Sequence, residues 1–273
     1  MKKILLLFAS TLFFLCSSSA PPYAAVLKVP AEYEGIQEAI NASADGDIII
    51  VGKGTYRENI MIRKAISIRS SGGADSTVVE AGVRSKPVVS IEGAKNVTLI
   101  GFTLKGSDLS GILIKDSSSS RIINNRAVKN ANGILVFSST RSKLFNNNFD
   151  SNSSYGVYLE KSTYNNLKEN TMSSNGDKGL FLSYSNNNVV TRNSANLNTW
   201  NGILVWTSNN NTIEENRTLR NTYGLVIAES SGNIFSGNVT LPNIFIIMPV
   251  LLIYAGVIVY MIQKQVIHLI YGE

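Results

Sequence analysis

The chain has 273 residues, with 25 lysines and arginines against 19 aspartates and glutamates and a formal net charge of +6. Its one cysteine, Cys16, and its one histidine, His268, lie near opposite ends of the chain. The region between them therefore cannot form a disulfide, and it lacks the His and Cys ligands that a copper site needs.

The first part of the chain has the features of a secretory signal peptide. Lys2 and Lys3 are followed by an apolar run at residues 4–15, and small residues continue to Ala25. This order of basic, apolar and small residues is typical of an export signal and not of a membrane span. We therefore expect residues 1–25 to be a signal peptide and the remainder to fold outside the cell or in the periplasm.

Residues 26–46 are predicted to cap one end of the fold. Within them, the segment 33–42 places Ile36, Ala39 and Ile40 on one helical face. A short helix here would cover the N-terminal edge of a stack of strands, which would otherwise be exposed.

A repeat of 22 or 23 residues occupies the centre of the chain. Each copy begins with a glycine, at Gly111, Gly133, Gly156, Gly179, Gly202 and Gly224. Apolar residues follow one, three and eleven positions later, and the first two of these lie on the same side of a strand. A fixed period of this length indicates a solenoid, in which each coil buries its apolar face against its neighbours. Less regular coils are expected upstream, at residues 48–51, 60–62, 66–68, 87–91 and 97–99.

Three polar columns accompany the apolar ones. A serine stands six positions after each glycine, and asparagines stand fourteen and nineteen positions after it. Identical amides about 4.8 Å apart can form a hydrogen-bonded ladder, and asparagine also tolerates the left-handed conformation of a corner. The pattern predicts an all-β fold, a right-handed parallel β-helix over residues 47–243. This prediction depends on Asn147, Asn170, Asn193 and Asn216 lying in a single row.

Residues 244–262 form an apolar stretch of 19 residues without a charge. A helix of this length is about 28 Å long, enough for the hydrocarbon core of a bilayer. Lys264 and His268 follow it, as expected on the cytoplasmic side. The sequence thus predicts a single-pass cell-membrane protein with a transmembrane helix at 244–262 and a cytoplasmic tail at 263–273. The alternative is a buried helix that packs on the solenoid.

An apolar stripe is predicted on one outer face of the β-helix. The position two residues after each glycine should point outward, yet it is apolar in all six repeats. The aromatic residues on this face, which are the candidate binding residues, are Phe137, Tyr158, Phe181 and Trp206. Exposed apolar surface often marks a binding site, and aromatic rings along a sheet suit stacking on sugars. The alternatives are that a loop or a partner chain covers the stripe, or that it only stiffens the sheet.

Basic residues predominate between Arg84 and Lys143, where ten lysines and arginines are opposed only by Glu92, Asp108 and Asp116. On a protein outside the cell, such a band favours an acidic polysaccharide or another anionic envelope polymer as partner. The alternative is an ordinary solvated surface. A nucleic-acid partner is not expected outside the cell.

The signal peptide, the glycine-initiated strands and the serine and asparagine columns together resemble the NosD-like group of right-handed β-helix proteins. Residues 54–58, GTYRE, are also similar to a segment of the pectinesterases and other pectin-lyase-like proteins. The resemblance implies a carbohydrate-binding or sugar-hydrolase type of β-helix at about residues 27–243 and, through NosD itself, copper delivery. Against copper, the only thioethers in this region are Met61 and Met172, far apart in the repeat, so we predict no metal site and no cofactor.

The motifs that would identify a related enzyme are missing. The carboxylate motifs of polygalacturonases and pectinesterases, the Asp cluster of pectate lyases and the His motif of mannuronan epimerases are absent, so no catalytic residue is predicted. We expect a membrane-anchored, non-catalytic envelope module that binds a carbohydrate or a partner. Two alternatives stay open: a polysaccharide lyase or related enzyme, and a structural or accessory subunit with a membrane-protein partner.

Overall fold

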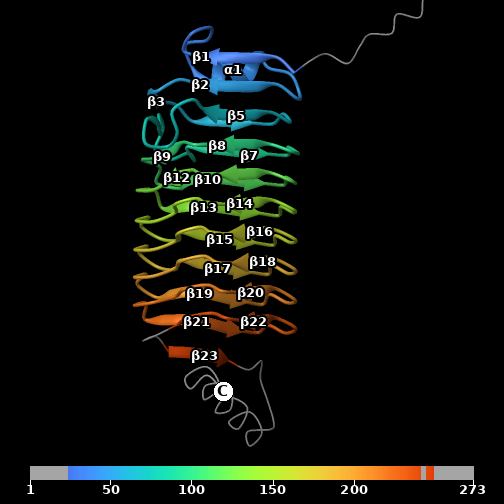
Figure 1. Ribbon diagram of the computed structural model, residues 1–273, viewed down its shortest axis with the longest axis vertical. Helices are drawn as coiled ribbons and strands as arrows, with labels where there is room; N and C mark the ends of the chain where they lie inside the picture. The colour runs from blue at the N-terminus through green and yellow to red at the C-terminus, as the bar shows by residue number, and fades with distance from the viewer. Residues whose placement is uncertain (1–23, 241–243, 249–273) are drawn as a thin grey trace, which may run out of the picture.

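The repeats of the chain form the coils of a parallel β-helix, which stack along one axis (Figure 1). The computed structural model describes residues 24–240 and 244–248. Within these residues the strands form three parallel sheets, which we name the ten-, nine- and four-stranded sheets. Each strand pairs with the equivalent strand of the next coil, so consecutive coils lie about 4.8 Å apart.

The ten-stranded sheet runs the length of the stack, and along most of its strands buried and more exposed residues alternate. Its strands are, in spatial order, β1 (Val26–Val29), β2 (Ile48–Val51), β5 (Ser67–Ser70), β8 (Thr98–Ile100), β11 (Arg121–Ile123), β14 (Lys143–Phe145), β16 (Asn166–Lys168), β18 (Val189–Thr191), β20 (Thr212–Glu214) and β22 (Ile234–Ser236).

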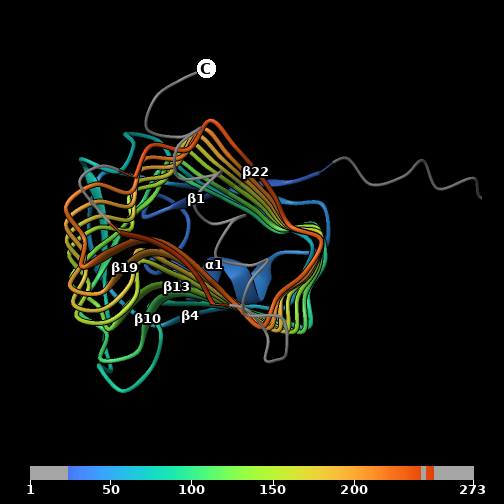
Figure 2. The same cartoon turned by 90° about the horizontal axis from the view of Figure 1, so that it is seen from below.

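The nine-stranded sheet forms a second side of the coil, and the two sheets enclose the core (Figure 2). Its strands are β4 (Ile60–Ile62), β7 (Val89–Glu92), β10 (Ser110–Lys115), β13 (Asn132–Phe137), β15 (Val157–Glu160), β17 (Leu180–Ser183), β19 (Asn201–Trp206), β21 (Tyr223–Ala228) and β23 (Ile244–Met248).

The third side of the coil is shorter and less regular. Its strands are β3 (Gly54–Arg57), β6 (Thr77–Glu80), β9 (Thr103–Lys105) and β12 (Arg126–Ala127). In later coils this side is reduced to single bridges, which run from Arg126 through Asn148 and Thr171 to Val239. A third strand is therefore present only in the upstream coils of the described residues.

The predicted apolar columns are the core. The residues one position after each glycine pair in register and are at most 1% exposed: Ile112, Ile134, Val157, Leu180, Ile203 and Leu225. The columns three and eleven positions after the glycine are also buried, except that Phe235 in the last complete coil is only partly buried.

The repeated glycine is required by close approach and not by a left-handed backbone. A Cβ atom on Gly179 would lie 2.6 Å from the carbonyl oxygen of Gly202 and 2.7 Å from the Cβ of Ala195. Real Cβ atoms do not approach neighbours this closely. The glycine therefore lets adjacent coils stack without a side chain between them.

The asparagines fourteen positions after the glycine lie in a single row, which confirms the central prediction. The Nδ2 atom of each donates to the Oδ1 of the next, at 2.9 Å from Asn147 to Asn170 and 3.0 Å for each of the two following pairs, Asn170–Asn193 and Asn193–Asn216. The backbone N–H groups of the first three also donate to the next Oδ1, at 2.8 to 3.0 Å. These asparagines are buried and their amides are committed to the scaffold.

The predicted serine and second asparagine columns also form ladders. The second asparagine ladder includes the pairs Asn152–Asn175 at 3.3 Å and Asn175–Asn198 at 3.1 Å. In the serine column the backbone N–H of Ser162 donates to the Oγ of Ser185, at 3.1 Å.

A further ladder, nine positions after the glycine, was not predicted. It contains Asn165, Asn188, Asn211 and Asn233, with amide contacts of 3.0 to 3.1 Å.

The corners differ from the prediction in one respect. The left-handed residue is the one before the ladder asparagine: Asn124 has φ of 55° before Asn125, and Arg192 has φ of 56° before Asn193. The asparagine then satisfies carbonyls released by the turn, since the Nδ2 of Asn125 donates to Ile123 O at 3.0 Å. The ladder residue and the left-handed residue are thus two different positions.

The predicted N-terminal cap is present. Helix α1 (Ile36–Ala42) buries Ile36, Ala39 and Ile40 and lies across the end of the coil (Figure 2). The backbone N–H groups of Ile36 and Gln37 donate to the carboxylate of Glu58 at 2.9 and 2.8 Å. Strand β1, which belongs to the predicted cap region, pairs with β2 and adds the first strand of the stack.

The predicted C-terminal transmembrane helix is wrong at its start. Residues 244–248 form strand β23, which pairs with β21 and so continues the nine-stranded sheet. Isoleucine and phenylalanine favour strands, and an apolar run alone does not separate a strand from a helix. Among the residues that the structure describes, no helix is long and apolar enough to cross a membrane. The remainder of the predicted helix, the predicted tail at 263–273 and residues 1–23 of the predicted signal peptide lie outside the described residues.

Candidate functional site

The outer face of the nine-stranded sheet carries the predicted apolar stripe. The residues two positions after the glycine pair in register across six coils, as Leu113, Leu135, Tyr158, Phe181, Leu204 and Val226. They are half-buried, except that Phe181 and Val226 are buried, at 9% and 6% exposed. Neighbouring side chains of the stripe therefore shield one another from solvent.

Three of the four predicted binding residues form one stack. The rings of Tyr158 and Phe181 are 4.9 Å apart and 7° from parallel. Those of Phe181 and Trp206 are 6.3 Å apart and 15° from parallel. Because the three residues lie on successive coils, the rings face one another along the axis and present mainly their edges outward.

The fourth predicted residue, Phe137, stands apart from this stack. It makes no ring contact with Tyr158, Phe181 or Trp206 within the described part of the chain. Its ring is instead approached by the Nζ of Lys161, 5.9 Å from the ring centroid. It therefore extends the apolar face without joining the stacked rings.

Two tyrosines that were not predicted complete the cluster. Tyr155 lies 5.3 Å from Tyr158 and 5.9 Å from Phe181, and Tyr184 lies 5.8 Å from Trp206 at 57°. We call Tyr155, Tyr158, Phe181, Tyr184 and Trp206 the aromatic cluster. Its most open members are Tyr184, 50% exposed, and Trp206, 36% exposed.

A lysine is embedded in the cluster. The Nζ of Lys178 lies 5.2 Å from the Tyr155 ring and 5.4 Å from the Phe181 ring, and it is ion-paired with Asp177 at 2.8 Å. A cation held over two rings is attracted by their negative faces. The cluster thus combines apolar rings with a fixed ammonium and a carboxylate.

Burial and neighbouring carboxylates keep two of the three phenols of the cluster, those of Tyr155 and Tyr158, protonated. Burial, together with the charge of Glu160 and a hydrogen bond to it, raises the pKa of Tyr158 to about 12. Burial and the nearby Asp177 also raise the pKa of Tyr155. Both hydroxyls are therefore hydrogen-bond donors at neutral pH and not bases.

Sequence reasoning missed Tyr155, Tyr184 and Lys178 because it followed strand alternation beyond the ends of the strands. Tyr184 stands five positions after its glycine, where strand alternation would point its side chain inward. Its backbone is left-handed, with φ of 48°, so the in-and-out alternation of the strand ends before it. Tyr155 and Lys178 also lie outside the strands, just before β15 and β17 begin. A search for aromatic residues at the corners next to the stripe would have found both tyrosines.

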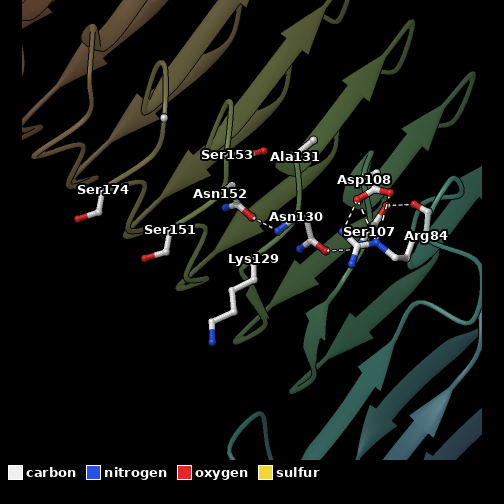
Figure 3. Close-up of a pocket in the computed structure, with 11 residues that line it drawn as sticks. Arg84, Ser107, Asp108, Lys129, Asn130, Ala131, Ser151, Asn152, Ser153 and Ser174 are labelled. Carbon is white, nitrogen blue, oxygen red and sulfur yellow. Dashed lines mark hydrogen bonds and ion pairs between the residues drawn. The ribbon is translucent and has the colours of Figure 1, made fainter.

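Apart from the aromatic cluster, a polar hollow lies at a corner of the coils (Figure 3). It has a volume of about 700 Å³ and is lined by Arg84, Ser107, Asp108, Lys129, Asn130, Ala131, Ser151, Asn152, Ser153, Ser174 and Gly176. Arg84 and Asp108 are ion-paired at 2.6 Å, and the amides of Asn130 and Asn152 belong to the ladder. The side chains of Arg84, Asp108, Asn130 and Asn152 are therefore committed to the fold, whereas Lys129 and the hydroxyls of Ser151, Ser153 and Ser174 form no side-chain hydrogen bond or ion pair within the described part of the chain.

The described residues hold no metal-ligating group of three or more His, Cys, Asp or Glu side chains. The two methionines of the β-helix are separated: Met61 is 39% exposed, and Met172 is fully buried in the core. The copper chemistry implied by the NosD-like resemblance finds no ligand set among these residues.

Comparison with known proteins places the fold in a family. Residues 87–240 match the family described as the right handed beta helix region, and the chain belongs to this family. Over 107 residues it is 36% identical to a cell surface glycoprotein of Methanothermus fervidus, covering 38% of this chain and 17% of that protein. The chain thus spans less than a fifth of the length of that relative.

Solved structures share the fold at low sequence identity. A periplasmic alginate epimerase, AlgG, superposes with a TM-score of 0.57 and 18% identity, covering 72% of this chain and 61% of that chain. The pectate lyase Pel9A gives a TM-score of 0.59 and 13% identity, covering 84% and 75%. These likenesses establish a right-handed, pectin-lyase-like β-helix. The narrower NosD-like relationship stays a prediction.

Proposed function

We propose that this protein is a β-helix module exposed outside the cytoplasm that binds a glycan chain along its nine-stranded sheet. The location is supported by the similarity to a cell surface glycoprotein. The alginate epimerase and the pectate lyase, at 18% and 13% identity, support the fold alone. The binding role rests on the aromatic cluster.

The observation that carries the proposal is the open end of the cluster at Tyr184 and Trp206. Their rings meet at 57°, and both are exposed on the same outer face. Two rings at this angle form a corner against which the C–H face of a sugar ring can pack. The interior rings Tyr158 and Phe181 cover one another and hold the corner in place.

Polar groups beside the rings suit the hydroxyls of a sugar. Lys178, paired with Asp177, lies over the rings of Tyr155 and Phe181, and Glu160 lies beside Tyr158. A binding site for carbohydrate needs a few fixed donors and acceptors next to an apolar platform. The arrangement has both, spread over the three coils of β15, β17 and β19 along the direction in which a linear glycan would extend.

The proposal is tested by replacing the exposed end of the cluster. Binding of the full-length protein to a glycan array identifies a ligand, and its affinity is then measured for Trp206→Ala and Tyr184→Ala. Loss of one stacked ring should weaken binding about tenfold. The matched control is Tyr164→Ala, which removes a ring that is 57% exposed but lies outside the cluster.

Equal affinity of the Trp206 variant and the control would refute the proposed site. Unsaturated sugar products released from a bound polymer would instead identify a lyase. If no glycan on the array is retained, the binding role is rejected.

A further inference from the structure

The outer face of the ten-stranded sheet has a different character from the aromatic face. Along β1, β2, β5, β8, β11, β14, β16 and β18, every charged residue is basic: Lys28, Arg69, Arg121, Lys143 and Lys168. The first acidic residue along the sheet is Glu214, on β20. Arg69, Arg121, Lys143 and Lys168 span four coil spacings, about 19 Å, and we call them the basic row.

Two members of the basic row oppose each other without compensation. Arg121 and Lys143 pair in register on neighbouring coils, and both are exposed. Like charges directly opposite in a sheet are destabilising. Neither forms an ion pair with any residue that the structure describes.

Several other arginines of the described coils are neutralised by a carboxylate. Arg57 is paired with Glu80 at 3.2 Å on the four-stranded sheet, and Arg192 with Glu215 at 2.6 Å at the corner after β18. Arg121 and Lys143 have no such carboxylate within ion-pair distance among the described residues. An anion between them would remove the repulsion.

Neighbouring aromatic rings hold further cations beside this pair. Arg141 lies over the ring of Tyr164, 5.5 Å from its centroid, and Lys168 lies 6.0 Å from the centroid of Phe145. Lys168 also approaches Glu169 at 3.5 Å, which partly neutralises it. Arg141 makes no ion pair among the described residues.

We propose that the basic row is a second binding surface, which takes a linear anionic polysaccharide carrying carboxylate groups. The cations follow one another along the solenoid axis in a line one or two side chains wide. This shape matches a linear anionic polymer better than it matches a flat anionic surface. Arginine binds a carboxylate through two parallel N–H donors, so Arg121 would fix the position of one sugar unit. This inference does not depend on the aromatic cluster, which lies on a different sheet.

The test measures binding of the full-length protein to polygalacturonate, with dextran as the neutral polymer. The double variant Arg121→Gln/Lys143→Gln should bind polygalacturonate about tenfold more weakly at low ionic strength, and wild-type binding should fall steeply with added salt. The matched control, Arg57→Gln/Arg192→Gln, removes the same charge from paired arginines and should stay within about twofold of the wild type. Arg121→Lys/Lys143→Arg keeps the charge and should retain binding, which separates charge from folding.

The inference is overturned if both Gln double variants lose affinity equally, because net charge alone would then explain binding. It is also overturned if dextran binds as well as polygalacturonate, or if anionic phospholipid vesicles bind more tightly than the polymer. Loss of binding in Trp206→Ala with no change in the Arg121 variant would place the acidic chain on the aromatic cluster instead.

Discussion

The ring of Tyr158 lies 4.9 Å from the ring of Phe181, only 7° from parallel. The two residues pair in register on adjacent coils, so their stacking follows from the spacing of the strands themselves. Phe181 is thereby stacked between Tyr158 and Trp206, and the Nζ of Lys178 lies 5.4 Å from the centre of its ring. The outer face of this sheet thus contains both a structural ring, Phe181, and an accessible ring, Trp206.

The first prediction separates these two roles. Phe181→Ala should lower the free energy of unfolding by about 2–3 kcal/mol, because it opens a cavity in a nearly closed stack. Trp206→Ala should lower it by less than about 1 kcal/mol, because much of that side chain is already in water. The measurement is the shift of the urea unfolding midpoint monitored by circular dichroism. Equal shifts for the two variants would show that the stack has no closed interior.

The second prediction concerns the glycine column. Gly179→Ala should destabilise the protein by about 3 kcal/mol, at the upper end of overpacking, because the new methyl group would meet the backbone of the next coil. The control is Gly46→Ala, where φ is 94° and no atom lies within 4 Å of the added Cβ. That variant carries only the left-handed backbone penalty, about 1–2 kcal/mol. Comparable melting temperatures for Gly179→Ala and the wild type would contradict the close-packing explanation.

Much of this architecture could be predicted from the sequence because the coils repeat. Each coil of a solenoid places the same side chain in the same environment, so a column of six asparagines or six glycines identifies its own physical role. The core columns and the row from Asn147 to Asn216 were predicted for this reason, and the cap helix was predicted from the helical spacing of its apolar residues. The argument needs only the strand spacing and the alternation of side chains.

The parts that could not be predicted lie where the repetition or the alternation ends. The ladder nine positions after the glycine was missed because its first two positions are Ser120 and Ser142, so the column is not uniform. Tyr184 was missed because a left-handed residue interrupts the alternation. At the C-terminal end of the stack, the apolar residues 244–248 could begin a helix but pair with β21 instead. Only the presence of the free edge of β21 decides between a helix and a strand.

The third prediction uses the incomplete ladder. The Oγ atoms of Ser120 and Ser142 are buried and have no hydrogen-bond partner. Ser142→Asn would place an amide next to Asn165, extend the ladder by one coil and replace the unsatisfied hydroxyl. We expect the variant to be about 1 kcal/mol more stable than the wild type. The check is the urea midpoint of unfolding.

A matched control tests whether any buried serine in these columns gains stability when it is replaced by asparagine. Ser139→Asn changes the serine column, where the Oγ of Ser139 accepts from the N–H of Ser117 at 3.0 Å and donates to Phe137 O at 2.8 Å. It should be destabilising. If Ser142→Asn destabilises as much as Ser139→Asn, the two columns do not differ in the way that the structure indicates.

The fourth prediction concerns pH and the half-buried carboxylate of Asp150. Burial raises the pKa of Asp150, although Ser173 N–H, the hydroxyl of Thr171 and the amide of Asn148 donate to it. A carboxyl with a raised folded-state pKa favours its protonated form in the native state. Its contribution to stability is therefore complete below the unfolded pKa, about 3.9, and is lost as the pH rises through the folded pKa.

Asp150→Asn removes this titration, so the stability of the variant relative to the wild type should increase as the pH rises from about 3 to 7, whatever the constant effect of the substitution. Asp108→Asn provides the opposite sign, because a hydrogen bond from Arg84 lowers the pKa of Asp108. That variant should lose stability relative to the wild type over the same pH interval. Melting temperatures of the three proteins at several pH values measure both differences. Parallel curves for the wild type and Asp150→Asn would mean that Asp150 is as well solvated in the folded protein as in the unfolded chain.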